Sequence, residues 1–420
     1  MLQFNGLKIK GFKELIQAGG ILFLASIFAN ICFLLFWLFM VRRLSSVEYG
    51  VLNTLFSLLM ILLLPTSTIQ TVITKFVSQF YALRDFVGIK YFTIHFAKRI
   101  SLADVLFLAL FIIISPALGS FLKIPINLII VTGIILFISI ISPLTLGILQ
   151  GAQRFLSLSV NIIIGSFLRL ILAVSLVFVG FKVMGALVGV ALSTGLALII
   201  SFFQIPQEIL EARGNSSKQI RIDSVYQYSL PVFFSLLGWL VLTNIDVILV
   251  KHYFLPIEAG FYSVAQMVGK IILFLPSIIS VVLFPKMSEA TVKQRQVLPL
   301  LKKGLILTAF LCITASIFCI LYPNLVLKIL TRKQDWESIK LVPFFCIAMT
   351  FYALVNQFIF YNLAIQSYRF TIYILIASLL QIGLISLFHP NLAAVLFSLI
   401  LCSALLFVLG FFELVITQKK

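Results

Sequence analysis

Hydrophobic and polar positions along this chain are grouped on the scale of whole membrane crossings. Apolar runs of about 20 residues, the length that crosses a hydrocarbon layer about 30 Å thick, are separated by short polar connections. In lipid such runs are helical, because strand edges would leave backbone groups unpaired. The pattern predicts twelve transmembrane helices, at residues 17–40, 49–80, 100–121, 127–149, 155–180, 183–205, 226–250, 257–284, 298–322, 339–363, 370–388 and 391–415.

Composition supports this fold class. Of the 420 residues, 62% are hydrophobic and 10% are charged, whereas a soluble globular chain has about 25% charged residues. No soluble fold buries so much apolar surface, and the alternation typical of a membrane β-barrel is absent. We therefore expect an all-α integral membrane protein. The first apolar run is too long for a signal peptide and lacks a small-residue cleavage site, so we expect residues 1–19 to be retained.

The longest polar connection divides the chain near its midpoint. It reads QEILEARGNSSKQIRID at residues 207–223, with six predicted helices on each side. Connections in compact bundles are short, so this stretch is read as a linker rather than a soluble domain. The predicted organisation is a six-helix bundle at 1–206, a cytosolic linker at 207–224 and a second six-helix bundle at 225–420.

The two predicted bundles share a repeated sequence. The run VRRLSSVEYGVLNTLFSLLMILLLPTSTIQTVITKF from Val41 matches VKHYFLPIEAGFYSVAQMVGKIILFLPSIISVVLFPKM from Val250, and GILQGAQRF matches NLAIQSYRF. An even number of helices in each copy gives parallel repeats, with a substrate site expected between them near mid-membrane. The paired residues are Glu48 with Glu258, Gly50 with Gly260, Pro65 with Pro276, Lys75 with Lys286, and Arg154 with Arg369.

The formal net charge of +18 would suggest nucleic acid as a partner in a soluble protein. In a membrane protein the cations must instead be assigned to the connections on each side. With the amino terminus in the cytosol, nineteen cations fall on the cytosolic side and nine on the other. We therefore expect a multi-pass protein of the cytoplasmic membrane with both termini cytosolic, and no nucleic-acid partner.

The three cations assigned to neither side, Lys75, Arg169 and Lys270, fall inside predicted spans, where a charge is costly and marks a functional candidate. Arg169 and Lys270 lie near the middle of their helices. A guanidinium fork and a compact ammonium suit phosphate oxygens, so both residues could receive an anionic head group; the alternative is a structural ion pair. Lys75 shares a polar stripe with Asn53, and either lines water or extends to the cytosolic surface.

Acids also fall within predicted spans, among them Asp246 and Asp104. Asp246 carries a coupling proton or sodium ion, or else forms an outer-edge pair with Lys251, Arg42 or Arg43. Asp104 is expected at the start of the helix at 100–121, where a helix amino terminus favours an anion.

Signals of catalysis are absent from the sequence. There is no GxxxxGK[ST], HExxH or GxSxG motif, and the three histidines lie in different connections. We expect no enzymatic activity, no cofactor and no metal site.

Four segments resemble a known family. LSSVEYGVLNTL, GILQGAQRF, NIDVILVKHYFLPIEAGFYSVAQ and FLPSIISVVLFPKMSEA resemble the polysaccharide-biosynthesis oligosaccharide flippases (Wzx-like). These belong to the multidrug/oligosaccharidyl-lipid/polysaccharide (MOP) superfamily, together with multidrug and toxin extrusion (MATE) antiporters and lipid II flippases. The resemblance implies a MATE-like, V-shaped pair of six-helix bundles that open alternately inwards and outwards.

The function that the resemblance implies is transport of a polyprenyl-diphosphate-linked oligosaccharide to the outer leaflet, for surface polysaccharide biosynthesis. H+ or Na+ and polysaccharide assembly proteins are further expected partners. The alternative is a cation-coupled, MATE-like multidrug exporter, whose cavity should be acidic; three interior cations against one clear interior acid, Asp246, weigh against it. We expect Lys270 and Arg169 to meet the diphosphate, Asp246 to couple an ion, and the sugars to be bound by Asn53, Asn161, Gln266 and Asn356, with Lys75 as a further substrate contact.

Overall fold

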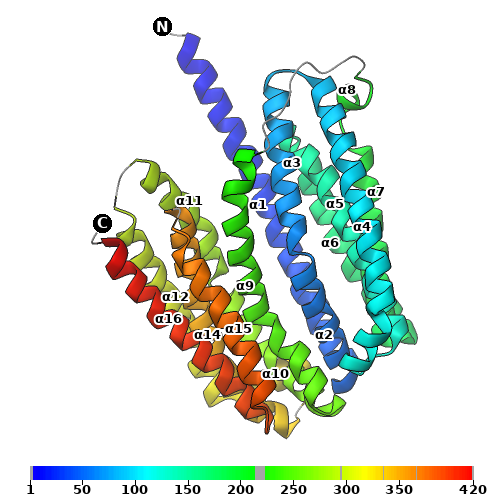
Figure 1. The fold of residues 1–420 in the computed structure, drawn as a ribbon, viewed down its shortest axis with the longest axis vertical. Helices are drawn as coiled ribbons and strands as arrows, with labels where there is room; N and C mark the ends of the chain where they lie inside the picture. The colour runs from blue at the N-terminus through cyan, green and yellow to red at the C-terminus, as the bar shows by residue number, and fades with distance from the viewer. Residues whose placement is uncertain (1–2, 213–222, 294–295, 334, 366, 419–420) are drawn as a thin grey trace. The chain divides into compact units, whose positions relative to one another are not determined.

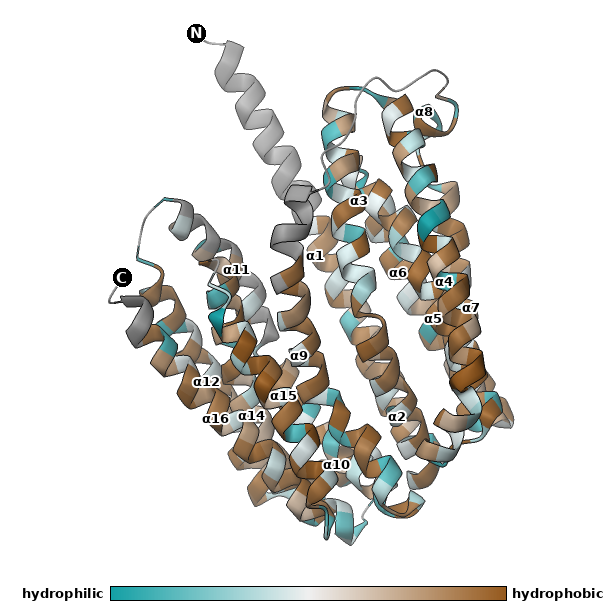
Figure 2. Cartoon of the chain, in the orientation of Figure 1, coloured by the Kyte–Doolittle hydropathy of each residue, from teal (hydrophilic) through white to brown (hydrophobic). Residues whose placement is uncertain are grey.

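The computed structural model describes residues 3–212, 223–293, 296–333, 335–365 and 367–418, and its regular structure in these residues is entirely helical (Figure 1). The predicted fold class, an all-α integral membrane protein, is confirmed. Hydrophobic residues cover most of the helices, with hydrophilic residues around α10 (Figure 2). The helices are α1 Gln3–Arg43, α2 Ser46–Leu62, α3 Leu64–Ala82, α4 Phe86–Leu122, α5 Ile126–Gly151, α6 Phe155–Leu176, α7 Lys182–Phe203, α8 Gln207–Leu210, α9 Asp223–Tyr253, α10 Pro256–Phe274, α11 Ser277–Val292, α12 Leu298–Leu321, α13 Pro323–Thr331, α14 Trp336–Ala364, α15 Arg369–Leu387 and α16 Leu392–Gln418.

Eleven helical stretches of the described chain are long and apolar enough to cross a membrane. One of them, Phe155–Phe203, has 49 residues and would be about 74 Å long as a single straight helix. It contains α6 and α7, which pack against each other. The chain turns between them at Gly180, whose φ of 110° favours glycine. Twelve crossings therefore stays a prediction, with α6 and α7 as the pair that would complete it.

The chain forms two compact units. Unit 1 comprises Met1–Arg43 and Leu62–Val225, and unit 2 comprises Leu44–Ile61 and Tyr226–Lys420. The predicted bundles divided the chain only at the linker, whereas Leu44–Ile61, which is most of α2, clusters with the C-terminal residues. Of the predicted linker, Gln207–Leu210 forms α8, and residues 213–222 lie outside the described residues.

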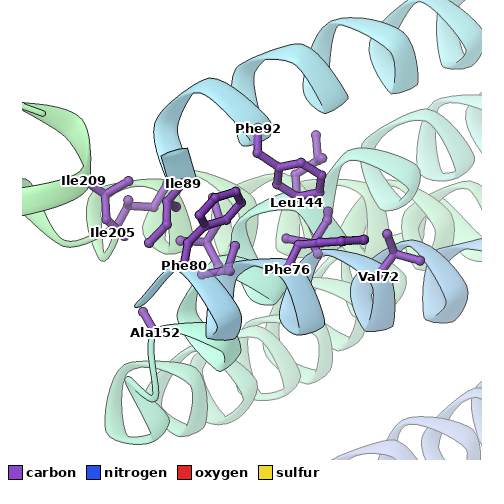
Figure 3. Close-up of a cluster of buried hydrophobic side chains, with 12 residues drawn as sticks. Val72, Phe76, Phe80, Ile89, Phe92, Leu144, Ala152, Ile205 and Ile209 are labelled. Carbon is purple, nitrogen blue, oxygen red and sulfur yellow. The ribbon is translucent and has the colours of Figure 1, made fainter. Parts of the chain in front are cut away.

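Unit 1 has an apolar core at one end, built from α3, α4, α5 and the segment around α8 (Figure 3). Aromatic rings form its centre, with Phe76 and Phe92 at a centroid distance of 5.1 Å. Glycines let α5 approach α3, since a Cβ at Gly147 would lie 2.8 Å from Ile73. Close backbone packing at small residues is how helices associate where lipid removes the hydrophobic drive.

The two matched proline positions both interrupt a helix. The predicted helix at 49–80 is two helices in the structure, ending at Leu62 and restarting at Leu64 just before Pro65. The predicted helix at 257–284 is likewise α10 and α11, with Pro276 in the break. Proline removes a backbone donor and clashes with the preceding turn, which explains why the interruption falls at the same place in both repeats.

Other matched residues have equivalent local roles. Glu48 accepts a hydrogen bond from the backbone N–H of Ser45 at 2.9 Å, and Glu258 accepts one from Leu255 at 3.0 Å. Each carboxylate thus stabilises the start of its own helix, α2 or α10. The matched glycines touch each other, because a Cβ at Gly50 would lie 3.0 Å from the Cα of Gly260. The structure therefore supports the internal repeat.

A loop at one end of unit 2 holds the start of α2. Lys333 Nζ donates to the carbonyl of Leu44 at 2.7 Å, and Ser46 Oγ donates to Asp335 at 3.0 Å. Burial lowers the pKa of Lys333, while Asp335 and Glu48 act in the opposite direction. These polar contacts add to the glycine contact in fixing α2 within unit 2.

Asp104 does not lie at a helix start. The helix predicted at 100–121 begins earlier, at Phe86, capped by Asp85, which accepts a hydrogen bond from Gly88 N at 2.7 Å. Asp104 therefore lies in mid-helix, where the helix amino terminus does not stabilise an anion. It is buried, and neither carboxylate oxygen has a hydrogen-bond partner in the described chain.

Candidate functional site

A polar cluster lies inside unit 2, centred on Asp246 of α9. The side chain of Asp246 is fully buried and accepts two hydrogen bonds on one oxygen, Oδ2. Tyr262 Oη donates at 2.8 Å and Gln266 Nε2 at 2.9 Å, both from α10. Tyr262 and Gln266 are four residues apart, so they share one face of that helix. Among the described residues of unit 2, Asp246 makes no ion pair, so the alternative of a pair with Lys251 is not formed there.

Asn53 of α2 completes this cluster. Its Nδ2 donates to Gln266 Oε1 at 2.9 Å, and both side chains are buried. Three predicted site residues, Asn53, Gln266 and Asp246, are thereby joined in one hydrogen-bonded row. The row runs from the first repeat into the second.

Lys270 lies on the same face of α10, one turn beyond Gln266. Its Nζ donates to Asn244 Oδ1 at 3.1 Å, and it interacts electrostatically with Asp246 without forming an ion pair within 4 Å. Asn244 is held in turn, since its Nδ2 donates to the carbonyl of Leu240 at 2.9 Å. The ammonium is thus oriented by a neutral partner, which leaves its charge able to attract an anion.

Arg169 belongs to unit 1, in the middle of α6. It is half-buried, and it makes no hydrogen bond or ion pair to any residue that the structure describes. Its Nε is fully buried and has no hydrogen-bond partner among the described residues. The alternative role as half of a structural ion pair is therefore absent from the described chain. A guanidinium inside a membrane span usually has such a partner.

The remaining predicted site residues have different settings. Asn161, two turns before Arg169 on α6, is buried and donates from Nδ2 to the carbonyl of Ala197 on α7 at 2.8 Å. Lys75 is exposed on α3. Asn356 is half-buried on α14 and has no hydrogen bond within the described residues. Asn161 has a structural partner, whereas the polar groups of Asn356 remain available.

A second polar row in unit 2 was missed by the sequence analysis. Tyr352 Oη donates to Gln381 Oε1 at 2.7 Å, and Gln381 Nε2 donates to the carbonyl of Leu242 at 3.1 Å. Tyr352 also interacts electrostatically with Asp246. Tyr352 lies in α14 and Gln381 in α15, both apolar helices. The only sequence signal for this row was a tyrosine and a glutamine in the interior of apolar runs.

The family profile described as "Polysaccharide biosynthesis protein" matches residues 15–291. The chain belongs to this family. The match begins in α1 and extends through the Asp246 cluster to α11, so it includes every predicted site residue except Asn356. No curated protein sequence matches the chain.

Solved structures show the same fold in transporters of the MOP superfamily. An inward-facing multidrug resistance MATE family transporter aligns with a TM-score of 0.73 at 12% identity, covering 93% of this chain and 96% of its own. The lipid II flippase MurJ, in an inward closed conformation, aligns at 0.68 and 15% identity, covering 95% and 87%. A MOP superfamily transporter from Pyrococcus furiosus aligns at 0.59 and 16% identity, covering 96% of each chain. The polysaccharide biosynthesis family member described here thus has a MOP transporter fold.

Proposed function

We propose that this protein is a flippase that moves polyprenyl-diphosphate-linked oligosaccharide units to the outer leaflet of the cytoplasmic membrane by alternating access. Its family is defined by polysaccharide biosynthesis, and its fold is shared with a lipid II flippase. In this proposal the diphosphate is attracted by Arg169 and Lys270, and Asp246 couples transport to an ion. Both termini are cytosolic, and polysaccharide assembly proteins are the expected partners.

The observation that carries this proposal is the state of Arg169. A buried guanidinium nitrogen without a partner costs free energy, because burying a charge is unfavourable unless it is paired. A diphosphate would supply that partner, with oxygens that match the planar fork of the guanidinium. Lys270 adds a second intramembrane cation whose only hydrogen-bond partner in the described chain is the neutral Asn244.

The polar residues predicted to hold sugars divide into two groups. Asn356 has unused hydrogen-bonding capacity and is the strongest remaining candidate. Asn161, Asn53 and Gln266 already bond within the fold, so they would contact sugars only through their remaining lone pairs or hydrogens. Lys75, exposed on α3, is proposed as a contact at the entry side rather than at the diphosphate.

The proposal is tested by reconstituting purified protein in vesicles and measuring transfer of a fluorescent polyprenyl-diphosphate oligosaccharide between leaflets. Arg169→Gln and Lys270→Gln should each reduce the transfer rate while the amount of inserted protein is unchanged. Lys340→Gln is the matched control, because Lys340 forms an exposed pair with Glu337. Wild-type transfer in both neutral variants would refute the assigned head-group site. Proton-driven dye efflux abolished by Asp246→Asn, without lipid transfer, would favour a multidrug exporter.

A further inference from the structure

The two oxygens of the Asp246 carboxylate have different surroundings. Oδ2 accepts hydrogen bonds from Tyr262 and Gln266, whereas Oδ1 is fully buried and accepts none within the described residues. A carboxylate whose oxygens both accept hydrogen bonds is stabilised in its ionised form. Here both side-chain hydrogen bonds go to the same oxygen, Oδ2. Oδ1 is therefore the oxygen at which a coupling cation, either a metal ion or a proton, would bind.

The side chains that contact Asp246 present hydrogens toward it rather than oxygens. Gln266 directs its NH2 group at the carboxylate because its own Oε1 is occupied by the amide of Asn53. To turn its oxygen toward Asp246, Gln266 would have to lose the bond from Asn53 or force that amide to turn as well. Hard metal cations are bound by several oxygen ligands. The row from Asn53 to Asp246 therefore orients the site against a metal ion.

The charged and titratable groups around Asp246 also disfavour a metal ion. From α10 it faces Tyr262 and Lys270, and from α14 it faces Tyr352. The next charged residue along α9 is Lys251, which is also buried. A metal cation at Asp246 would be repelled by the ammonium of Lys270, and among the described residues no second carboxylate contacts Asp246 to offset that repulsion.

A proton meets none of these obstacles. Added to Oδ1, it would leave Oδ2 as a carbonyl oxygen with two lone pairs, able to keep both existing hydrogen bonds. It would also remove the buried negative charge. We propose that Asp246 is a proton-binding site whose hydrogen-bonded surroundings exclude Na+, so that the coupling ion of this transporter is H+. This inference rests on the proposed function only in treating the protein as an ion-coupled transporter.

The test measures ion binding to the full-length protein in lipid nanodiscs, without any lipid-linked substrate. A ligand that binds only the native state raises the temperature of unfolding. The wild-type protein should show no change when choline is replaced by Na+ at constant ionic strength. Lowering the pH should stabilise wild type relative to Asp246→Asn by roughly 2–4 °C, since a neutral buried acid is less costly than an ionised one.

A second variant tests the role assigned to the amide row. Asn53→Asp removes the donor that holds Gln266 Oε1 and adds carboxylate oxygens near the cluster, so this variant should gain a Na+-dependent rise in unfolding temperature. Asn356→Asp is the matched control, because it places a carboxylate elsewhere in unit 2, and it should gain none. Absence of a Na+ response in Asn53→Asp would overturn the argument that the amide row excludes the metal.

Two results from the wild-type protein and Asp246→Asn would overturn the proposal itself. One is a Na+-dependent rise in the unfolding temperature of wild type that is lost in Asp246→Asn. The other is a pH dependence that is the same in wild type and Asp246→Asn. Because no substrate is present, either result leaves the flippase proposal standing, and failure of lipid transfer would leave the ion assignment standing.

Discussion

Arg169 in unit 1 and Lys270 in unit 2 are both cations in the middle of apolar helices, yet their surroundings differ. Lys270 has an oriented hydrogen-bond partner in Asn244 and lies within electrostatic range of a buried acid. Among the described residues Arg169 has no hydrogen-bond or ion-pair partner, and its Nε is buried. Depth in the membrane therefore does not determine how a charge is used. One cation is part of an internal network, and the other has no hydrogen-bond partner among the described residues, a partner that the proposed substrate would supply.

The largest effect is expected at Arg169. Replacing it with methionine should reduce lipid transfer up to about 100-fold, because charge-assisted hydrogen bonds contribute about 1.5–3 kcal/mol. The free energy of unfolding should stay equal or rise, since the variant removes an unpaired buried charge. Arg169→Lys should retain part of the transfer through its charge while losing the planar fork. Vesicle transfer assays and thermal unfolding measure the two quantities; destabilisation by Arg169→Met would mean that the guanidinium has a structural partner after all.

Lys270→Met should show the opposite balance between stability and transfer. It leaves Asn244 Oδ1 without its donor and removes the cation near Asp246, so the free energy of unfolding should fall by about 1–3 kcal/mol. Transfer should also fall, but by less than in Arg169→Met. Equilibrium unfolding in detergent provides the comparison. Equal stability in Lys270→Met and wild type would remove the distinction drawn between the two cations.

A double-mutant cycle tests the network directly. Lys270→Met and Asp246→Asn should be non-additive, with a coupling free energy of about 0.5–3 kcal/mol, because each variant alone leaves a buried group uncompensated. Arg169→Met combined with Asp246→Asn should be additive within about 0.5 kcal/mol. The unfolding free energies of the single and double variants supply both couplings. Coupling free energies of similar size in the two cycles would contradict the conclusion that Lys270, but not Arg169, belongs to the Asp246 network.

The smallest effect is expected on the helix that carries Arg169. Asn161→Ala removes the bond to Ala197 that joins α6 to α7, which should cost about 0.6 kcal/mol, the usual value for an interhelical hydrogen bond in a membrane. Transfer should be nearly unchanged if Asn161 is structural. Asn356→Ala is the matched comparison and should reduce transfer with little change in stability. A large decrease in the transfer rate of Asn161→Ala would indicate that Asn161 binds the sugars after all.

Most of the fold follows from the sequence because the length and apolarity of each run set where a helix can cross the bilayer. The starts of α5, α6 and α12 lie within one residue of the predicted positions. The start of α4 at Phe86 was missed, since the helix continues through polar residues that no hydropathy pattern includes. The breaks near Pro65 and at Pro276 lie within apolar runs that hydropathy alone does not divide.

The individual residues of the candidate site could be predicted from the sequence, but the contacts between them could not. Lys270, Asp246 and Arg169 are conspicuous because charges are rare in apolar helices. The bond between Asn53 and Gln266 joins residues 213 positions apart, and helical periodicity carries no information at that separation. The partner of Lys270 was likewise beyond the sequence, because whether an ammonium meets Asn244 or Asp246 depends on distances of a few ångströms.

The placement of α2 has a consequence for how the protein is made. Leu44–Ile61 leaves the ribosome early, yet the residues that it packs with in unit 2 begin at Tyr226. At synthesis rates of about 5–20 residues per second, α2 waits roughly 10 to 40 s until α9 and α10 are complete. During that interval Asn53 has no Gln266 to bond. Biogenesis would then depend on lipid, water or an insertion factor shielding this polar face until the second half of the chain arrives.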